Sequence, residues 1–257
     1  MKEVAITATL LEKIASGLGP DAILVGGQAL ATWVAFYRID AYEHLVGPSI
    51  SDDADFLGVR SNVMEIATTT HGTSVFPTPR EITALVGQVH IPVSQTEFVN
   101  VDVLHRIVGL DAAAIRNNAQ TLQIGDAALR IMSPLDILVS RVENLRKLED
   151  KRNSQGIMQA RLAIPVVRAH ILEYLNANEE KPAISLIERV AKIAKSAAGR
   201  MATRDFGVSF LLAIPHEAVK NAHFQKIRWP RMVNELNMAA GLPCGPVRTR
   251  SKSGLKR

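Results

Sequence analysis

The sequence predicts an α+β fold, in which a small mixed β-sheet precedes a bundle of helices. Short apolar runs of β-type composition alternate with helical segments as far as residue 132, whereas almost every later segment has the apolar spacing of an amphipathic helix. The chain has 257 residues, of which 47% are hydrophobic, so it can bury a large core. We expect a sheet domain over residues 1–132, a helical domain over 133–247 and a disordered basic tail over 248–257.

The start of the chain predicts a helix, a strand and a second helix. Apolar residues at helical spacing indicate a helix over 1–18, which Gly19-Pro20 ends. The apolar run 22–25 is typical of a short buried strand. Gly26-Gly27 then turns the chain into a helix over 28–37.

This glycine turn is a candidate phosphate-binding site. A strand, a glycine turn and a helix N-terminus together can bind an anion, because the free N–H groups and the helix dipole point toward it. The candidate residues are Gly26, Gly27 and Gln28. The alternatives are that the two glycines serve loop geometry alone and that Gln28 only caps the helix.

Three aspartates are the candidate metal ligands. Asp53 and Asp55 fall in a predicted strand over 53–59, where residues two apart point to the same face. Asp102 lies between apolar residues in a second predicted strand, 98–104. Like charges packed together cost stability unless a cation neutralises them, and carboxylate oxygens suit Mg²⁺ or Mn²⁺. The pattern therefore favours metal-dependent phosphate chemistry.

A purely structural role for these acids is the competing interpretation. Aspartates at strand ends often cap helices or pair with arginines, and Arg106 lies close to Asp102 in the sequence. Asp52 should point away from Asp53, so we interpret it as a loop or capping acid.

The remaining sheet elements are predicted by composition and turn residues. They are a helix over 64–70, a loop over 71–80, a strand over 84–93 and a hairpin over 122–132 that turns at Gly125-Asp126. Ser133-Pro134-Leu135-Asp136 then begins a helix, with serine as N-cap, proline in the first position and an acid in the first turn. Further along, Pro165 should kink or end its helix.

Arg141 is the candidate cation of the site. It falls on the predicted helix that follows the sheet, beside an apolar stripe. A guanidinium there either extends to solvent or reaches into a cleft toward phosphate.

Charge is distributed unevenly along the chain. Residues 1–136 hold 8 lysines and arginines against 15 aspartates and glutamates, a formal charge of −7, whereas residues 137–257 hold 22 against 10, or +12. A basic half beside an acidic metal site would suit an anionic polymer such as RNA. The alternative is a set of solvated helices with a basic tail.

The same residues resemble a known enzyme superfamily. Gly26-Gly27, followed by Asp53-Ala54-Asp55-Phe56 and a later strand with Asp102, resembles the nucleotidyltransferase signature. Gly26-Gly27-Gln28-Ala29-Leu30 and the helix start at Ser133 are similar to the AbiEii/MenT-like, toxin-type branch. The resemblance covers about residues 20–150. Two features differ from the family pattern: 25 residues separate Gly27 from Asp53, and Arg141 stands near the family's lysine.

The resemblance implies a polymerase-β-like core and a defined activity. Asp53, Asp55 and Asp102 would hold Mg²⁺ or Mn²⁺ and act in catalysis, and Gly26, Gly27, Gln28 and Arg141 would bind the NTP. A nucleoside monophosphate would pass to a hydroxyl, with RNA or tRNA as the expected acceptor, and an antitoxin protein is a possible partner for an enzyme of this type. Transfer to a small molecule or protein, or nucleotide binding without turnover, are the alternatives.

Other features bear on the compartment. The single cysteine, Cys244, excludes an intramolecular disulfide and is typical of a reducing cytoplasm. We find no charged leader followed by an apolar segment, since Glu3 and Glu12 lie in the first 13 residues, and no apolar stretch of membrane-spanning length. The expected protein is therefore cytoplasmic, with no membrane partner.

Overall fold

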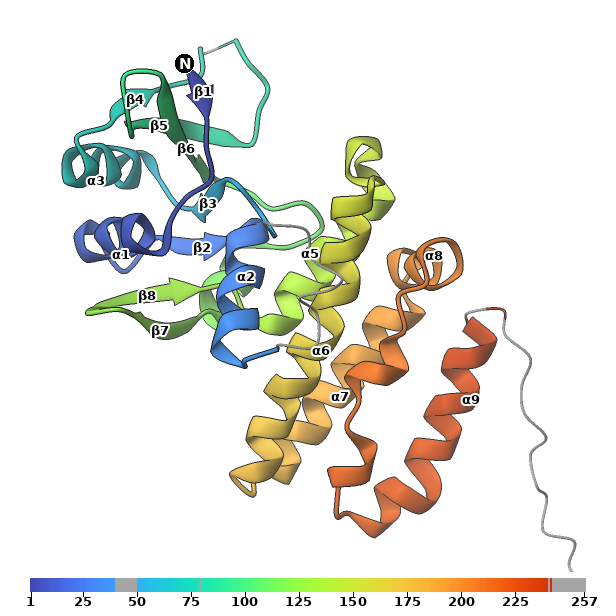
Figure 1. Cartoon of the computed structure of the whole chain (residues 1–257). Coiled ribbons are helices and arrows are strands. Elements are labelled where there is room, and N and C mark those ends of the chain that lie inside the picture. Colours follow the sequence, from blue (N-terminus) through green and yellow to red (C-terminus); the bar gives the residue numbers. More distant parts are fainter. Residues whose placement is uncertain (40–49, 79, 240, 242–257) are drawn as a thin grey trace, which may run out of the picture.

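The computed structural model describes residues 1–39, 50–78, 80–239 and 241. Within them it contains an eight-stranded mixed sheet followed by helices (Figure 1), which confirms the predicted α+β class. The strands follow the order β4-β5-β6-β3-β2-β8-β7, and β1 pairs with β6 outside this path. Their bounds are β1 (Lys2–Glu3), β2 (Ile23–Val25), β3 (Ala54–Leu57), β4 (Thr73–Val75), β5 (Leu85–Pro92), β6 (Glu97–Leu104), β7 (Gln120–Ile124) and β8 (Ala127–Ile131).

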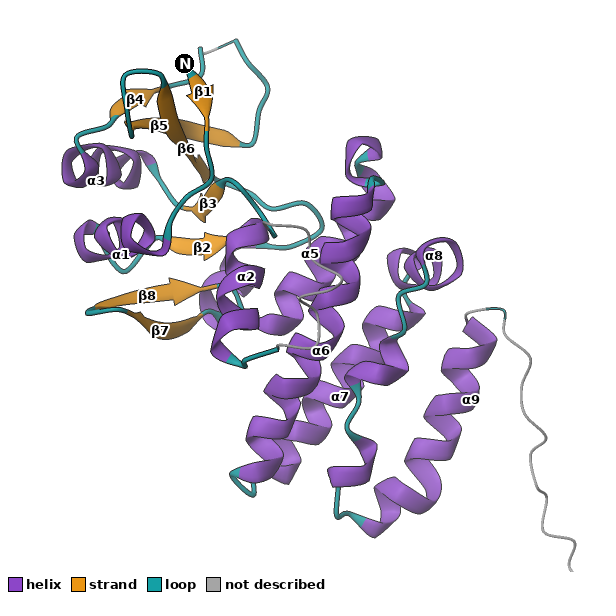
Figure 2. Cartoon of the chain, in the orientation of Figure 1, coloured by secondary structure: helices purple, strands orange, loops and turns teal. Residues whose placement is uncertain are grey.

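Helices flank the sheet and make up most of the chain after β8 (Figure 2). The α-helices are α1 (Ala8–Gly17), α2 (Gly26–Phe36), α3 (Arg60–Thr70), α4 (Ala112–Asn118), α5 (Pro134–Lys147), α6 (Ser154–Asn176), α7 (Glu180–Lys195), α8 (Ala197–Phe206) and α9 (Trp229–Ala239). Short 3-10 helices occur at Glu149–Lys151, Phe210–Ala213 and His216–Ala218, and a π-helical turn at Phe224–Arg228. None of the helices in the described ranges combines the length and apolar character needed to cross a bilayer.

The layers place one helix between the sheet and the later helices. The α1 and α3 helices pack against each other beside the sheet, whereas α2 lies between the strands and α5–α6 (Figure 1). One continuous apolar core joins the layers, since Phe56 and Val101 of the sheet belong to the same cluster as Leu138 and Val167 of the helices.

The prediction of a helix over 1–18 is wrong for its first seven residues. Residues 2–3 instead form β1, because the backbone of Lys2 donates to Thr96 O (2.6 Å) and that of Val4 to Phe98 O (2.9 Å). The helix begins at Ala8, where the Thr7 hydroxyl accepts a hydrogen bond from the Leu10 N–H (3.2 Å). Pairing with the first residues of β6, which β3 does not reach, therefore outweighs the local helical spacing.

Other boundaries also differ from prediction. Asp53 precedes β3 instead of lying on it, and the predicted loop 71–80 contains β4, which pairs with β5. The α3 helix begins four residues before the predicted start at 64. Pro165 lies inside α6, which continues past it, so the alternative that Pro165 ends its helix is wrong. The β4 strand forms because tertiary pairing outweighs local propensity.

Two local predictions are confirmed. The hairpin predicted over 122–132 is formed by β7 and β8. The predicted helix start is that of α5, where Ser133 Oγ accepts from the Asp136 N–H (3.3 Å) and Pro134 occupies the first helical position.

Candidate active site

A row of polar side chains crosses the centre of the sheet. The parallel pairing of β3 with β6 places Asp55 directly beside Asp102, and the antiparallel pairing of β5 with β6 places Gln88 on the other side of Asp102. Directly paired residues on neighbouring strands point to the same face. Two carboxylates that are 47 positions apart in the sequence therefore become neighbours.

Asp102 is held by two amides. Its Oδ1 accepts from Gln88 Nε2 (2.8 Å) and from Asn100 Nδ2 (2.8 Å), while Oδ2 takes no part in these two bonds. Among the ion pairs of the described residues, none joins Asp102 to Arg106 or to another cation. The alternative that Asp102 pairs with Arg106 is therefore wrong. The two amides instead fix the orientation of the Asp102 carboxylate.

Asp55 packs against the glycine turn. Gly26 has φ of +69°, and a Cβ added there would overlap Asp55 Oδ2. Burial, and next the charge of Asp102, raise the pKa of Asp55 to about 6, while Arg141 acts in the opposite direction. Glycine at position 26 thus permits the left-handed backbone conformation, and it also lets the Asp55 carboxylate approach the start of α2 closely.

The second glycine and its neighbour support the chain that leads to the aspartates. A Cβ on Gly27 would overlap the side chain of Ser51. The Gln28 side chain donates from Nε2 to Ser51 O (2.7 Å). Its observed contact is thus with the backbone next to Asp52, while the first turn of α2 has no side-chain cap from Val25.

Glu3 joins the acidic cluster, and sequence reasoning missed it. Strand β1 lies along β6 in line with β3, which sets the Glu3 carboxyl within hydrogen-bonding contact of Asp53. Burial, followed by that hydrogen bond and the nearby charge, raises the pKa of Glu3. The alternation of Val4 and Ile6 with polar or small residues was the one local hint of an extended strand.

These residues line a pocket of about 730 Å³. One wall comes from β1, β3, β6 and the segment that precedes β3, and the other comes from α5, the start of α6 and the 3-10 helix between them. The acidic members of the first wall are Glu3, Asp52, Asp53, Asp55 and Asp102, and Lys2 lies beside them on β1. The second wall contributes Arg141, Asn144, Lys151, Asn153, Gln155, Gly156 and Gln159. The volume lies in the range of about 300–1,000 Å³ that small-molecule ligands occupy.

Arg141 belongs to the pocket and not to the outer surface. Its Nη1 donates to Gln159 Oε1 (2.8 Å) and its Nη2 to Ser140 Oγ (3.3 Å). Its Nε is buried and has no hydrogen-bond partner among the described residues. Burial lowers the pKa of Arg141, and Asp55 offsets part of that effect. Arg141 therefore lines the same pocket as the carboxylates.

The donor set suits a hard cation without forming a complete cage. Within the described residues, no group of three or more histidine, cysteine, aspartate or glutamate side chains is arranged to hold a metal ion by itself. Mg²⁺ commonly binds through one or two carboxylates, with water and substrate phosphate as its other ligands. Asp55 and Asp102 fit that role, because a cation between them would relieve the repulsion that raises the pKa of Asp55.

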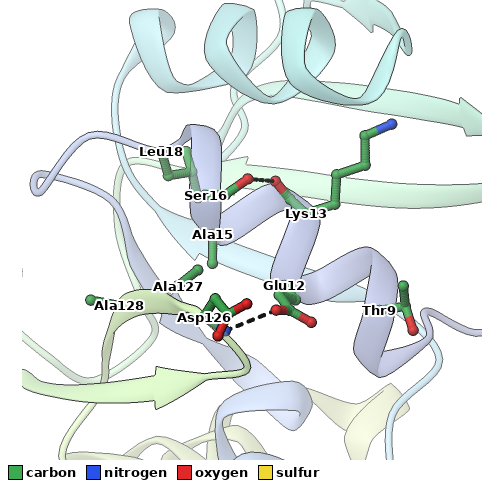
Figure 3. Close-up of a pocket in the computed structure, with 9 residues that line it drawn as sticks. All are labelled: Thr9, Glu12, Lys13, Ala15, Ser16, Leu18, Asp126, Ala127 and Ala128. Carbon is green, nitrogen blue, oxygen red and sulfur yellow. Dashed lines mark hydrogen bonds between the residues drawn. The ribbon is translucent and has the colours of Figure 1, made fainter.

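A second cavity of about 630 Å³ has a different character (Figure 3). It lies between α1 and the β7–β8 hairpin, where Glu12 Oε1 accepts from the Asp126 N–H (2.9 Å) and Ser16 donates to Lys13 O (2.8 Å). Glu12 is therefore occupied in holding the hairpin turn. The rest of the lining is Thr9, Lys13, Ala15, Ser16, Leu18, Asp126, Ala127 and Ala128.

Comparison with known proteins identifies no family. No protein-family model matches the chain, and a search of curated proteins gives no match. Among solved structures, the crystal structure of JHP933 from Helicobacter pylori is similar with a TM-score of 0.41 at 12% identity, covering 91% of this chain and 88% of that one.

Proposed function

We propose that the protein is a metal-dependent nucleotidyltransferase, which moves a nucleoside monophosphate from an NTP to a hydroxyl and releases pyrophosphate. One observation carries the proposal: Asp55 and Asp102 are neighbours across β3 and β6, beside the glycine turn of α2 and facing Arg141 over a nucleotide-sized pocket. The order of these residues in the sequence supports it, because it resembles the toxin-type nucleotidyltransferases.

The acidic wall is assigned to the cation and to the attacking hydroxyl. Asp55 and Asp102, with Asp53 beside them, would hold Mg²⁺ or Mn²⁺, which when bound would neutralise phosphate charge. Asp102 is the residue we assign to accept the hydroxyl proton, because two amides fix its orientation. The hydroxyl oxygen bonds to the α-phosphorus as the bond to the pyrophosphate oxygen breaks.

The opposite wall is assigned to the phosphates. Arg141 has an unused Nε–H, and the first turn of α2 at Gly26 and Gly27 has N–H groups with no side-chain cap. Lys151, on the same wall, adds positive charge. Gln28 is bonded to Ser51 O, so its contribution to phosphate binding would require that bond to break.

For the acceptor we propose the hydroxyl of an RNA, with tRNA as the first candidate, on the strength of the +12 charge of residues 137–257. A specific observation favours a small hydroxylated acceptor as the second candidate. Several cations of the helical half already bond carboxylates, among them Arg189 with Asp136 (3.2 Å) and Arg228 with Glu188 (2.8 Å). An antitoxin partner and a member that binds nucleotide without turnover remain proposals from the family resemblance.

The test is label transfer and pyrophosphate release. Purified protein would be incubated with each α-labelled NTP, Mg²⁺ or Mn²⁺ and total cellular RNA. Asp55→Asn is the inactive variant, and Asp126→Asn, in the exposed hairpin turn, is its matched control. We expect label on an RNA band with the wild type and D126N and none with D55N.

Other outcomes would change the proposal. Pyrophosphate release with label on a small product would favour the second acceptor. Metal-dependent NTP binding without pyrophosphate release would favour a binding protein. Full activity of D55N would contradict the assignment of the site.

A further inference from the structure

Arg141 and the carboxylates share one pocket without forming an ion pair. Arg141 and Asp55 both line this pocket, Arg141 on the helical wall and Asp55 on the sheet wall. Opposite charges in a poorly solvated pocket attract strongly and form charge-assisted hydrogen bonds when they can meet. Yet among the ion pairs of the described residues none includes Arg141, whose guanidinium bonds only to neutral groups. The guanidinium of Arg141 and the carboxylate of Asp55 are therefore held apart.

Gln159 of α6 is the side chain in position to do so. It is only 9% exposed, and both ends of its amide are used: Oε1 accepts from Arg141 Nη1 (2.8 Å) and Nε2 donates to Ile50 O (2.7 Å). The backbone carbonyl can only accept and the guanidinium can only donate, so the amide fits in one orientation. A Cβ on Gly27 would lie 3.1 Å from Nε2, so the glycine turn leaves just enough room for this amide.

We propose that Gln159 is a positioning residue that holds Arg141 away from Asp55. This keeps the carboxylates available to a divalent cation and the guanidinium available to a phosphate. Without the Gln159 oxygen, Arg141 would turn toward Asp55 and the pocket would neutralise itself. The cation and phosphate roles rest on the proposed function, whereas the separation itself rests on the contacts of Gln159 alone.

The first experiment measures Mn²⁺ binding to Gln159→Leu by calorimetry or electron paramagnetic resonance. Leucine removes the acceptor but keeps a buried side chain of similar reach. We expect Mn²⁺ to bind about tenfold more weakly, the factor that one charge-assisted hydrogen bond of ordinary strength represents. MgNTP should also bind more weakly, because the guanidinium is withdrawn from the phosphate position.

A double variant separates positioning from packing. In Q159L/Arg141→Met no arginine remains to compete for Asp55, so Mn²⁺ affinity should return to that of the Arg141→Met single variant while MgNTP binding stays weak. If the double variant binds Mn²⁺ as weakly as Q159L, Gln159 has a packing role and the proposal is wrong.

Gln123 supplies the matched control. It is an exposed glutamine on β7 and does not line the pocket. Gln123→Leu should therefore bind Mn²⁺ as the wild type does. If Q159L does not fold, as judged by thermal denaturation, Gln159→Asn is the second variant: its amide is one methylene too short to bond both partners, and we expect the same loss.

Crystal structures of the metal-free wild type and Q159L would test, independently of any activity, whether Gln159 holds Arg141 away from Asp55. We expect the guanidinium to bond the Asp55 carboxylate in Q159L only, and an unmoved Arg141 would overturn the inference. If the wild type binds neither Mn²⁺ nor NTP, the proposed function fails, while this structural comparison still shows whether Gln159 separates the two groups.

Discussion

The two halves of the molecule differ in whether their charged side chains have partners of opposite charge. In the sheet half, carboxylates gather where they repel one another, as Asp55 does with Asp102 and Glu3 with Asp53. In the helical half, many cations are already partnered. Lys195 bonds Glu235 (2.9 Å), and Arg168 pairs with Glu217.

Arginines of the helical half also bond the ends of helices. Arg161 donates to Phe206 O (2.7 Å), the last residue of α8, and Arg152 donates to Leu145 O (2.8 Å) near the end of α5. Carbonyls there lack partners within the helix, so a cation satisfies them. These cations support the fold.

The difference teaches that the net charge of a segment says less about function than how its charges are satisfied. Several cations of the second half are held in ion pairs and at helix ends, whereas a few carboxylates of the first half are left in an arrangement that costs stability. Such costs are commonly retained at functional sites. Four predictions test this contrast, beginning with the largest expected effect.

The largest effect is expected at Asp102. Asp102→Asn should lower pyrophosphate release on the order of 1,000-fold, because it removes both a cation ligand and the proton acceptor. Asn100→Ala removes only one of the two amides that orient Asp102, so we expect a loss of about tenfold. Equal losses in the two variants would show that Asp102 acts only through local structure.

The ionised Asp55 carboxylate should lower the free energy of unfolding when no metal is present. Its pKa in the folded protein, about 6, is above the ordinary value of 3.8. Its contribution therefore favours folding below pH 4 and is lost as the pH rises through 6, by about 2–3 kcal/mol.

Asp55→Asn should thus raise the free energy of unfolding at pH 7.5 and change it much less at pH 4. Urea denaturation in the presence of a chelator at both pH values measures this difference. A D55N variant that is less stable than the wild type at pH 7.5 would contradict the interpretation of Asp55 as a destabilising charge.

Alanine substitutions at Gly26 and Gly125 can be compared to separate the effect of backbone strain from the effect on the pocket. Both have positive φ, +69° and +59°, and an added Cβ would overlap Asp55 at Gly26 and Glu12 at Gly125. Alanine at either position should cost about 1–2 kcal/mol of unfolding free energy. Only Gly26→Ala should also weaken Mn²⁺ and NTP binding, because it alone displaces a carboxylate of the pocket.

The smallest effect is expected on the helical surface. Lys192 of α7 is exposed, whereas Lys195 is paired with Glu235. If RNA is the acceptor, Lys192→Glu should lower RNA labelling a few-fold at low salt and leave NTP binding unchanged. Lys195→Ala should change stability by about 0.5 kcal/mol or less, as exposed ion pairs do. Labelling that K192E leaves unchanged would favour a small acceptor.

Some of the site could be predicted because its signals are local. An apolar run before Gly26-Gly27 indicates a strand that turns into a helix, and the structure forms β2 and α2 there. Ser133 and Pro134 mark the start of α5 for the same reason, since capping depends on neighbours within four residues. The sequence places Arg141 on that helix, but it does not decide whether the side chain enters the pocket or extends to solvent.

Other features could not be predicted because they depend on contacts between distant segments. The prediction that Asp53 shares a strand face with Asp55 is wrong, since β3 begins at Ala54, although both residues line the pocket. Glu3 arrives through the pairing of β1 with β6, against a local helical spacing. Cys244 and the tail predicted over 248–257 lie outside the described residues.

The sequence by itself determined the α+β class, the glycine turn, the hairpin and the presence of acids on two strands, because periodicity, glycine conformation and helix capping act within a few residues. Only the tertiary structure decided that Asp55 lies beside Asp102 and that Gln159 lies between Arg141 and Ile50. The pattern of one strand does not specify its neighbour or register, and a buried amide finds its partners only when separate elements pack together.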